Sequence, residues 1–145
     1  MKKSILSLVL VAFILNGCRY EEGVLNFQSP ENRLVAELWI LSHVLKDGVE
    51  ITEVPNDALK INNYYTFYYG GPMSVVTYTE TGQLIENTHG EWAFENKYKK
   101  IHIYFILRNK RYTYTARIVK LSAKEFKYRY TDDDGVEWTL EFYKG

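Results

Sequence analysis

The sequence predicts an all-β domain, an up-and-down antiparallel β-barrel of about eight strands. Apolar and polar residues alternate with a period of two along several segments, which is typical of strands with one buried face. Turn residues, among them two Asp-Gly pairs, separate these segments. The chain of 145 residues also contains 13 Tyr, 7 Phe and 3 Trp, side chains that favour strands. Closure into a barrel removes the exposed edges of a flat meander; an open sandwich is the alternative fold.

The N-terminus has the features of a secretory signal. Two lysines precede an uncharged, mostly apolar run at residues 4–15. This run is shorter than the roughly 20 residues of a transmembrane helix, but its length is typical of a signal peptide. It ends in Leu-Asn-Gly-Cys at 15–18, which resembles the lipobox of bacterial lipoproteins. The resemblance implies that residues 1–17 are removed and that Cys18, the single cysteine, receives acyl chains such as palmitate. A plain secretory signal with an incidental cysteine is the alternative.

A lipobox implies a location in the bacterial cell envelope and a membrane contact through the lipid anchor. Arg19 stands where some bacteria use Asp to retain lipoproteins in the inner membrane, so we expect the outer membrane, on its periplasmic or its outer face. Glu21-Glu22 weakly resembles an acidic signal for export to the cell surface. Residues 18–32 have no apolar periodicity and contain Gly23 and Pro30, which predicts a flexible tether behind the lipidated cysteine.

The domain is predicted to span residues 33–145. Its first half is predicted to form a series of strands. Residues 34–45 predict a long first strand that carries Trp39, although a helix is the alternative for this segment. Asp47-Gly48 supplies the positive φ of a tight hairpin. Residues 55–58 fit a single helical turn. The other predicted strands of this half lie within 49–53, 59–69, 73–80, 83–87 and 91–95.

The second half shows the clearest alternation. Four segments, 101–107, 112–118, 126–130 and 136–142, place large apolar groups on one face. The other face carries mainly charged residues and threonines in the last three segments, and His102, Tyr104 and Ile106 in the first. This pattern predicts an antiparallel sheet that is wet on one side. The short connections between the segments, one of them Asp134-Gly135, favour consecutive hairpins.

Several short motifs follow one another along residues 34–143. They are Trp39-Ile40-Leu41 before Asp47-Gly48, the strand 59–67, Gly90-Glu91-Trp92-Ala93-Phe94, Tyr114-x-x-x-Ile118-x-x-Leu121-Ser122, Phe126-Lys127-Tyr128 and Trp138-x-Leu140-x-Phe142. This arrangement resembles the lipocalin-like domain of small bacterial lipoproteins. The resemblance implies an eight-stranded up-and-down barrel without shared catalytic residues, which binds small apolar molecules or acts as an interaction module of the envelope.

The inward aromatic side chains are the candidate ligand-binding residues. A barrel of about eight strands either fills with side chains or holds one small ligand. An aromatic lining with tyrosine hydroxyls suits a small hydrophobic ligand that has a polar end. The candidates are Trp39, Tyr65, Phe67, Trp92, Phe94, Phe105, Tyr112, Tyr114, Tyr128 and Trp138.

The alternative function is a non-enzymatic protein-interaction module of an outer-membrane or cell-surface complex. It would use the aromatic segment 64–72, which places aromatic residues on both faces of one strand. An open cavity favours ligand binding, whereas a filled barrel with exposed Tyr64 and Tyr68 favours the interaction module.

No motif indicates catalysis or a cofactor. Neither a Gly-x-Ser-x-Gly elbow nor a phosphate-binding loop is present in the sequence. The three histidines lack helical metal-ligand spacing, and we expect His43, in step with Trp39, to be a buried histidine with a hydrogen-bond partner. Residues 132–134, three adjacent aspartates, fit a solvated hairpin turn better than a calcium site. We therefore expect no enzyme, no cofactor and no metal site.

The charge pattern argues against a nucleic-acid partner. The chain has 18 basic and 18 acidic residues, and a balanced charge gives no general attraction to nucleic acid. The basic residues at 97–100 and 108–111 flank the predicted strand 101–107. A strand of this length, about 23 Å, separates the two groups to opposite ends of the barrel.

Overall fold

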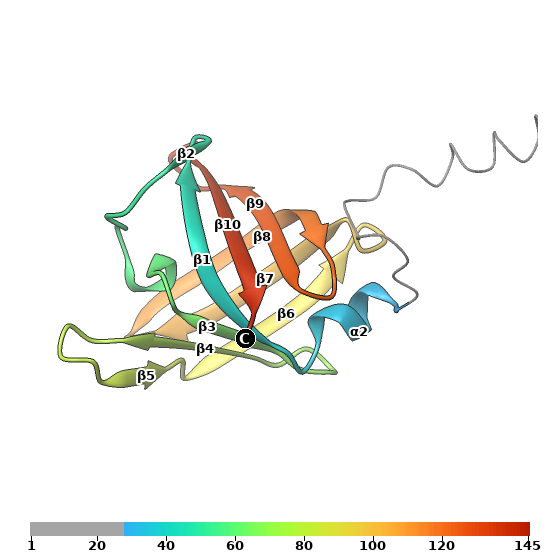
Figure 1. Cartoon of the computed structure of the whole chain (residues 1–145), viewed down its shortest axis with the longest axis horizontal. Helices are drawn as coiled ribbons and strands as arrows, with labels where there is room; N and C mark the ends of the chain where they lie inside the picture. The colour runs from blue at the N-terminus through green and yellow to red at the C-terminus, as the bar shows by residue number, and fades with distance from the viewer. Residues whose placement is uncertain (1–27) are drawn as a thin grey trace, which may run out of the picture.

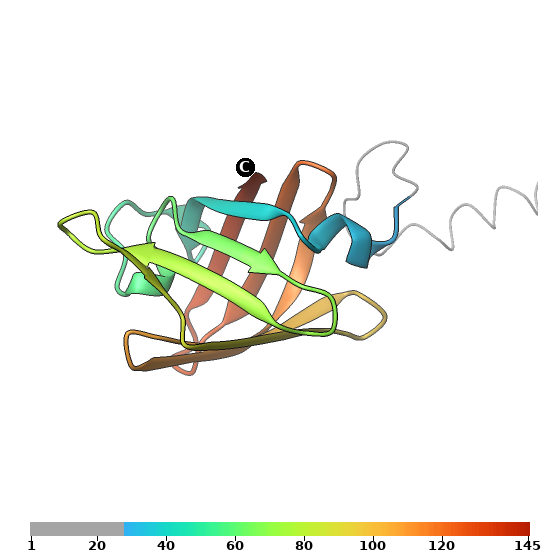
Figure 2. The same cartoon turned by 90° about the horizontal axis from the view of Figure 1, so that it is seen from below.

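The computed structural model describes residues 28–145, so the predicted signal peptide, Cys18 and most of the predicted tether lie outside the described residues. The described chain forms one antiparallel sheet of ten strands that curls into a half-barrel (Figures 1 and 2). In chain order the elements are α2 (Pro30–Leu34), β1 (Leu38–Lys46), β2 (Val49–Glu50), the 3₁₀ turn η1 (Asp57–Leu59), β3 (Tyr64–Phe67), β4 (Met73–Tyr78), β5 (Leu84–Glu86), β6 (His89–Glu95), β7 (Lys100–Leu107), β8 (Lys110–Leu121), β9 (Glu125–Thr131) and β10 (Glu137–Lys144).

The all-β prediction is confirmed, and the order of the strands shows how the sheet curls. Nine strands follow the order β5-β4-β3-β1-β10-β9-β8-β7-β6, and β2 pairs only with β1. The first and last strands are therefore hydrogen-bonded neighbours in the middle of the sheet, as in an up-and-down barrel. The two ends of the sheet approach each other, because β4 and β6 meet at a bridge between Pro72 and Glu91. There the Trp92 amide donates a 2.7 Å hydrogen bond to the Gly71 carbonyl.

A short helix replaces the end of the predicted tether and the start of the predicted first strand. Ser29 caps α2, since its hydroxyl accepts a bond from the Asn32 amide, and Pro30 occupies the first turn, where its missing N–H costs nothing. The buried Arg33 guanidinium donates a 2.7 Å bond to the Leu121 carbonyl at the end of β8. The first helix thus begins at Pro30, before residue 33, the predicted start of the domain. Strand β1 begins only at Leu38. Within 28–145 no helix has the length and apolar character needed to cross a bilayer.

The prediction of a buried His43 is wrong. The pairing of β1 with β10 shifts register between Leu41 and His43, which marks a β-bulge. A bulge inserts one residue and so reverses the face to which the following side chains point. Val44 is therefore fully buried, whereas the His43 side chain is 51% exposed and pairs with Glu50.

The core is a cluster of apolar side chains inside the half-barrel, with several aromatic rings at its centre. Phe126 contacts Trp39, Phe67 and Phe142, with ring centroids 5.6–5.9 Å apart. Tyr65 packs edge-on against Phe142 at 5.1 Å. All ten candidate aromatic residues lie in or against this core: Trp39, Tyr65, Phe67, Trp92, Phe105, Tyr128 and Trp138 are buried, and Phe94, Tyr112 and Tyr114 are partly buried. These side chains thus fill the interior of the half-barrel around Phe126.

Candidate functional site at the open end of the half-barrel

An open cleft of about 960 Å³ lies at the end of the half-barrel farther from α2. It is bordered by the β1–β2, β7–β8 and β9–β10 turns and by the loop that precedes η1. Its apolar surface consists of Ile51, Val54, Tyr112, Tyr114, Tyr130, Val136 and Trp138. Charged residues surround this surface, namely Lys46, Glu53, Lys110, Arg111, Asp132, Asp133 and Asp134. The cleft therefore combines an aromatic floor with a charged rim.

Stacked tyrosines form the floor. Tyr114 and Tyr130 stack with centroids 3.9 Å apart and planes 11° apart, and Tyr112 stacks on the buried Phe105 at 5.0 Å. The Tyr114 and Tyr128 hydroxyls share a 2.7 Å hydrogen bond. Burial raises the pKa of both hydroxyls well above the ordinary value of 10.0, so they stay neutral at physiological pH. The floor thus offers flat apolar faces and neutral hydroxyls.

Asp132 fixes the β9–β10 turn at the rim. The Trp138 indole N–H donates a 2.7 Å bond to its Oδ2, and the amides of Asp134 and Val136 donate to its Oδ1 at 3.0 and 2.9 Å. The bond from Trp138 is the largest cause that lowers the pKa of Asp132, and the two amides lower this pKa further. The carboxylate is thus occupied as the cap of a hairpin turn. Among residues 28–145, no group of three or more His, Cys, Asp or Glu side chains is arranged to hold a metal ion.

Because the Asp132 carboxylate caps this turn, we predict that the turn is sensitive to acid. A carboxyl whose pKa is lower in the folded state stabilises that state above its unfolded pKa, and this stabilisation is lost as the pH falls through the folded value. We expect the emission of Trp138 to change with a midpoint below pH 3.8, the ordinary pKa of the group. In Asp132→Asn the amide nitrogen meets the indole N–H, so this transition should disappear from the pH titration of tryptophan fluorescence. An unchanged titration in the variant would contradict the assigned contact.

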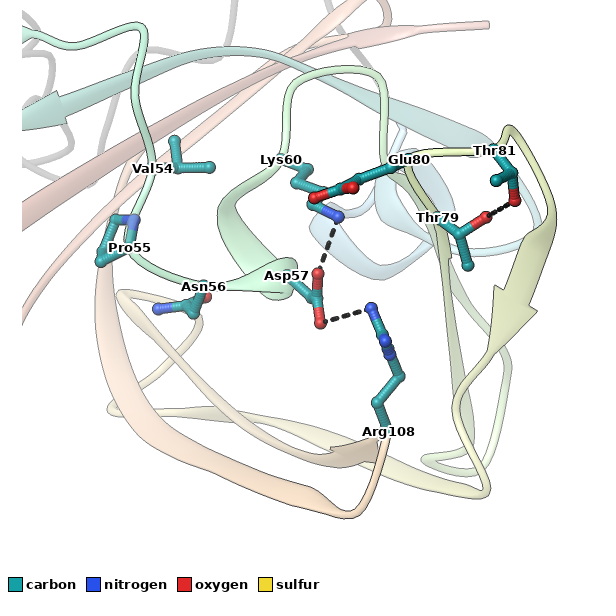
Figure 3. Close-up of a pocket in the computed structure, with 9 residues that line it drawn as sticks. All are labelled: Val54, Pro55, Asn56, Asp57, Lys60, Thr79, Glu80, Thr81 and Arg108. Carbon is teal, nitrogen blue, oxygen red and sulfur yellow. Dashed lines mark hydrogen bonds and ion pairs between the residues drawn. The ribbon is translucent and has the colours of Figure 1, made fainter.

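A second, more polar cleft of about 660 Å³ adjoins the first (Figure 3). Residues 54–56 line both clefts and so form a shared wall. Asp57 makes ion pairs with Lys60 at 2.8 Å and with Arg108, from the β7–β8 turn, at 3.3 Å. The hydrogen bond from Lys60 is the main cause that lowers the pKa of Asp57, and the charge of Arg108 adds to it. The loop before η1 is thereby tied to the hairpin across the opening.

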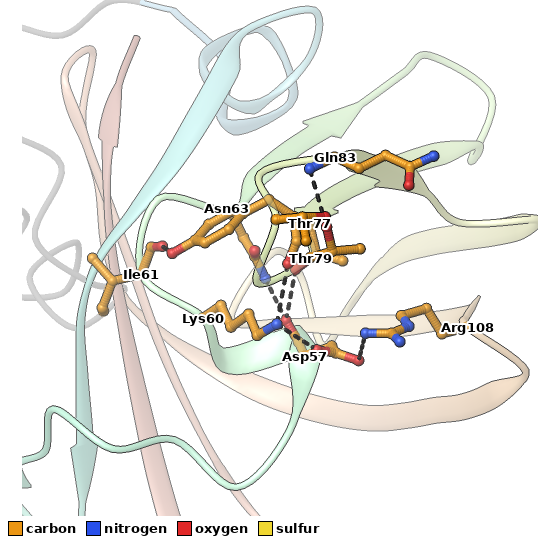
Figure 4. A network of polar contacts seen from close by, with 10 residues as sticks. Asp57, Lys60, Ile61, Asn63, Thr77, Thr79, Gln83 and Arg108 are labelled. Atoms are coloured by element: carbon orange, nitrogen blue, oxygen red, sulfur yellow. Dashed lines mark hydrogen bonds and ion pairs between the residues drawn. The ribbon is translucent and has the colours of Figure 1, made fainter.

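A polar network holds η1 in place, and Figure 4 shows the part of it around Asp57. The buried Asn63 amide donates a 2.7 Å bond to the Asp57 carbonyl, and the Tyr65 hydroxyl donates a 2.7 Å bond to the Ala58 carbonyl. Among the described residues, the buried side-chain polar atoms without a hydrogen-bond partner are the side-chain oxygens of Asn56 and Asn63. Asn56 belongs to the shared wall, and its unpaired oxygen is buried within that wall.

The structure divides the ten candidate residues into two groups. Tyr112, Tyr114 and Trp138 line the aromatic cleft, and Tyr128 supports its floor through Tyr114. The other six, Trp39, Tyr65, Phe67, Trp92, Phe94 and Phe105, belong to the core cluster or pack against it. Sequence reasoning missed Tyr130, although its strand parity with Tyr128 could have found it. It also missed Ile51 and Val54, which lie in a loop because the strand predicted within 49–53 ends at Glu50.

No protein-family model matches this chain, and no curated protein matches it. The chemistry of the cleft residues is therefore the basis for a functional proposal.

Proposed function

We propose that the protein is a lipid-anchored lipoprotein of the bacterial cell envelope, in the outer membrane, whose open cleft binds a small amphiphile. The observation that carries the ligand proposal is the aromatic floor at the open end of an otherwise filled half-barrel. Ligand sites typically combine a concave apolar surface with a few polar groups that orient the ligand. The lipobox ending at Cys18 supports the anchor and the envelope location.

The lining suggests how such a ligand would lie. Its apolar body would pack on the faces of Tyr112 and Tyr130 and against Val136. Its polar end would lie toward the charged rim, which offers both basic and acidic side chains. The filled core below Tyr114 limits the depth of the cleft. We therefore propose a compact amphiphile rather than a long acyl chain.

We propose binding rather than catalysis at this cleft. Its buried tyrosine hydroxyls have raised pKa values, which disfavours a role as general bases. The Asp132 carboxylate is taken up by three hydrogen bonds within its own turn.

Native mass spectrometry after incubation with an envelope lipid extract tests the ligand proposal. We expect a discrete added mass on the wild-type protein. The double variant Tyr112→Ser with Val136→Ser removes apolar surface from the floor, so we expect the added mass to be lost. Leu84→Ser is the matched control, because Leu84 is 61% exposed and lies outside the cleft. A bare wild-type mass, or equal binding by all three proteins, would contradict a ligand in this cleft.

A protein-interaction module is the second candidate, carried by the segment 64–72. Tyr68 and Tyr69 are 46% and 60% exposed, whereas Tyr64 is partly buried. Exposed aromatic side chains are common anchors of protein interfaces. The filled core around Phe126 supports this candidate, whereas the open cleft supports ligand binding.

A further inference from the structure

Exposed apolar side chains gather at one end of the half-barrel. Of the seven large hydrophobic side chains that are exposed within residues 28–145, five lie at the end with α2, opposite the aromatic cleft. We name these five the anchor-end surface: Leu38, Tyr68, Tyr69, Tyr98 and Tyr143. They come from the start of β1, the β3–β4 turn, the β6–β7 turn and the end of β10. Figures 1 and 2 show α2 and these two turns at the same end.

Direct contacts join the parts of this surface. Tyr98 packs edge-on against Phe94 at 5.1 Å, and Phe94 packs against Trp92 at 5.2 Å. The Trp92 indole N–H donates a 2.9 Å bond to the Tyr68 carbonyl, which connects the β6–β7 and β3–β4 turns. The Tyr69 hydroxyl lies 2.6 Å from Oδ1 of Asn32 in α2. These contacts connect Tyr98 with the β3–β4 turn, and Tyr69 of that turn with the helix.

The β6–β7 turn, at the end with α2, and the β9–β10 turn, beside the cleft, differ in charge. Residues 95–100, at the β6–β7 turn, contain three lysines and one glutamate, and these side chains are exposed. Residues 131–137, at the β9–β10 turn beside the cleft, contain four acidic residues and no basic one. An anionic surface would therefore attract the β6–β7 turn and repel the β9–β10 turn.

We propose that the anchor-end surface rests on an anionic phospholipid bilayer, with its tyrosines at the level of the headgroups. This proposal rests on the proposed lipidation of Cys18. The ten residue-to-residue steps from Cys18 to Gln28 span at most about 35 Å, and α2 begins at the end that carries the tyrosines. Tyrosine is enriched at membrane interfaces, and lysines near the surface attract anionic lipids. The aromatic cleft would then open away from the membrane, toward the aqueous phase.

A fluorescent label at two matched positions tests this orientation. The lipidated protein is isolated as Tyr69→Cys or Leu84→Cys, two positions that are 60% and 61% exposed at opposite ends of the half-barrel. Each introduced thiol carries an environment-sensitive dye, because the acylated Cys18 does not react. The proteins are reconstituted in phosphatidylethanolamine–phosphatidylglycerol vesicles that contain spin-labelled lipid. We expect a blue shift and several-fold stronger quenching at position 69 than at position 84. Adding Tyr68→Ser and Tyr98→Ser should reduce the quenching at position 69.

Three outcomes would overturn the proposal in distinguishable ways. Equal quenching at the two positions, or none at either, means that the surface does not rest on lipid although the anchor holds. A blue shift at position 69 in native membranes but not in pure lipid vesicles assigns the surface to a protein partner. If Cys18→Ser stays in the membrane fraction as the wild type does, the anchor itself has been misassigned.

Discussion

Replacement of Phe126 by alanine is expected to lower the free energy of unfolding by about 3–5 kcal/mol, the cost of deleting a fully buried phenyl ring. Phe126 is 0% exposed. Its ring contacts Trp39 of β1, Phe67 of β3 and Phe142 of β10, so it joins strands that are far apart in the sequence. The cavity left by the ring would border all three strands. Equilibrium unfolding in urea, followed by tryptophan fluorescence, measures this loss.

Phe94→Ala is the control for this prediction. Phe94 is only partly buried and packs on Trp92 and Tyr98 near the surface. The same chemical deletion should therefore cost clearly less at position 94, because solvent and neighbouring side chains can occupy the space. Equal losses for the two variants would mean that the cluster around Phe126 is not the centre of the core.

The strands of the second half could be predicted closely because their patterning is strong. The alternation at 101–107 corresponds to β7 at Lys100–Leu107, and the alternation at 136–142 corresponds to β10 at Glu137–Lys144. Each has large apolar residues on one face, so a shift by one residue would expose the whole set. The same parity identified the buried aromatic residues, including Trp39 and Tyr65.

Features that depend on a single inserted residue or on distant contacts were not predictable in this way. The bulge near Ser42 moves His43 outward, and no local pattern distinguishes it from a regular strand. Helix α2 was not predicted, because a helix this short is unstable in isolation and leaves little local signal. It is fixed by the contact of Arg33 with β8. The cleft was only partly predictable, since Val54 and Asn56 reach it from a loop held by Tyr65 and Asn63.

Gly90→Ala is expected to cost about 2–3 kcal/mol, because a side chain at this position would overpack the place where the sheet closes on itself. A Cβ atom on Gly90 would lie 2.5 Å from the Met73 carbonyl oxygen and 2.7 Å from Nδ2 of Asn87. The carbonyl belongs to the backbone of β4, so β4 and β6 must move apart to relieve this steric clash. The bond from the Trp92 amide to Gly71 spans the same approach and should open with it.

Hydrogen exchange of the Trp92 amide reports this separation directly. We expect faster exchange in Gly90→Ala, together with a lower urea midpoint. Ala93→Ser is the control on the same strand, since Ala93 is exposed and should tolerate the hydroxyl. Unchanged exchange and stability in Gly90→Ala would show that β4 and β6 do not approach as closely as Met73 and Gly90 indicate. Faster Trp92 exchange with little loss of stability would instead mean that the contact between β4 and β6 contributes little to the stability of the fold. The stability would then come mainly from the continuous sheet and the cluster around Phe126.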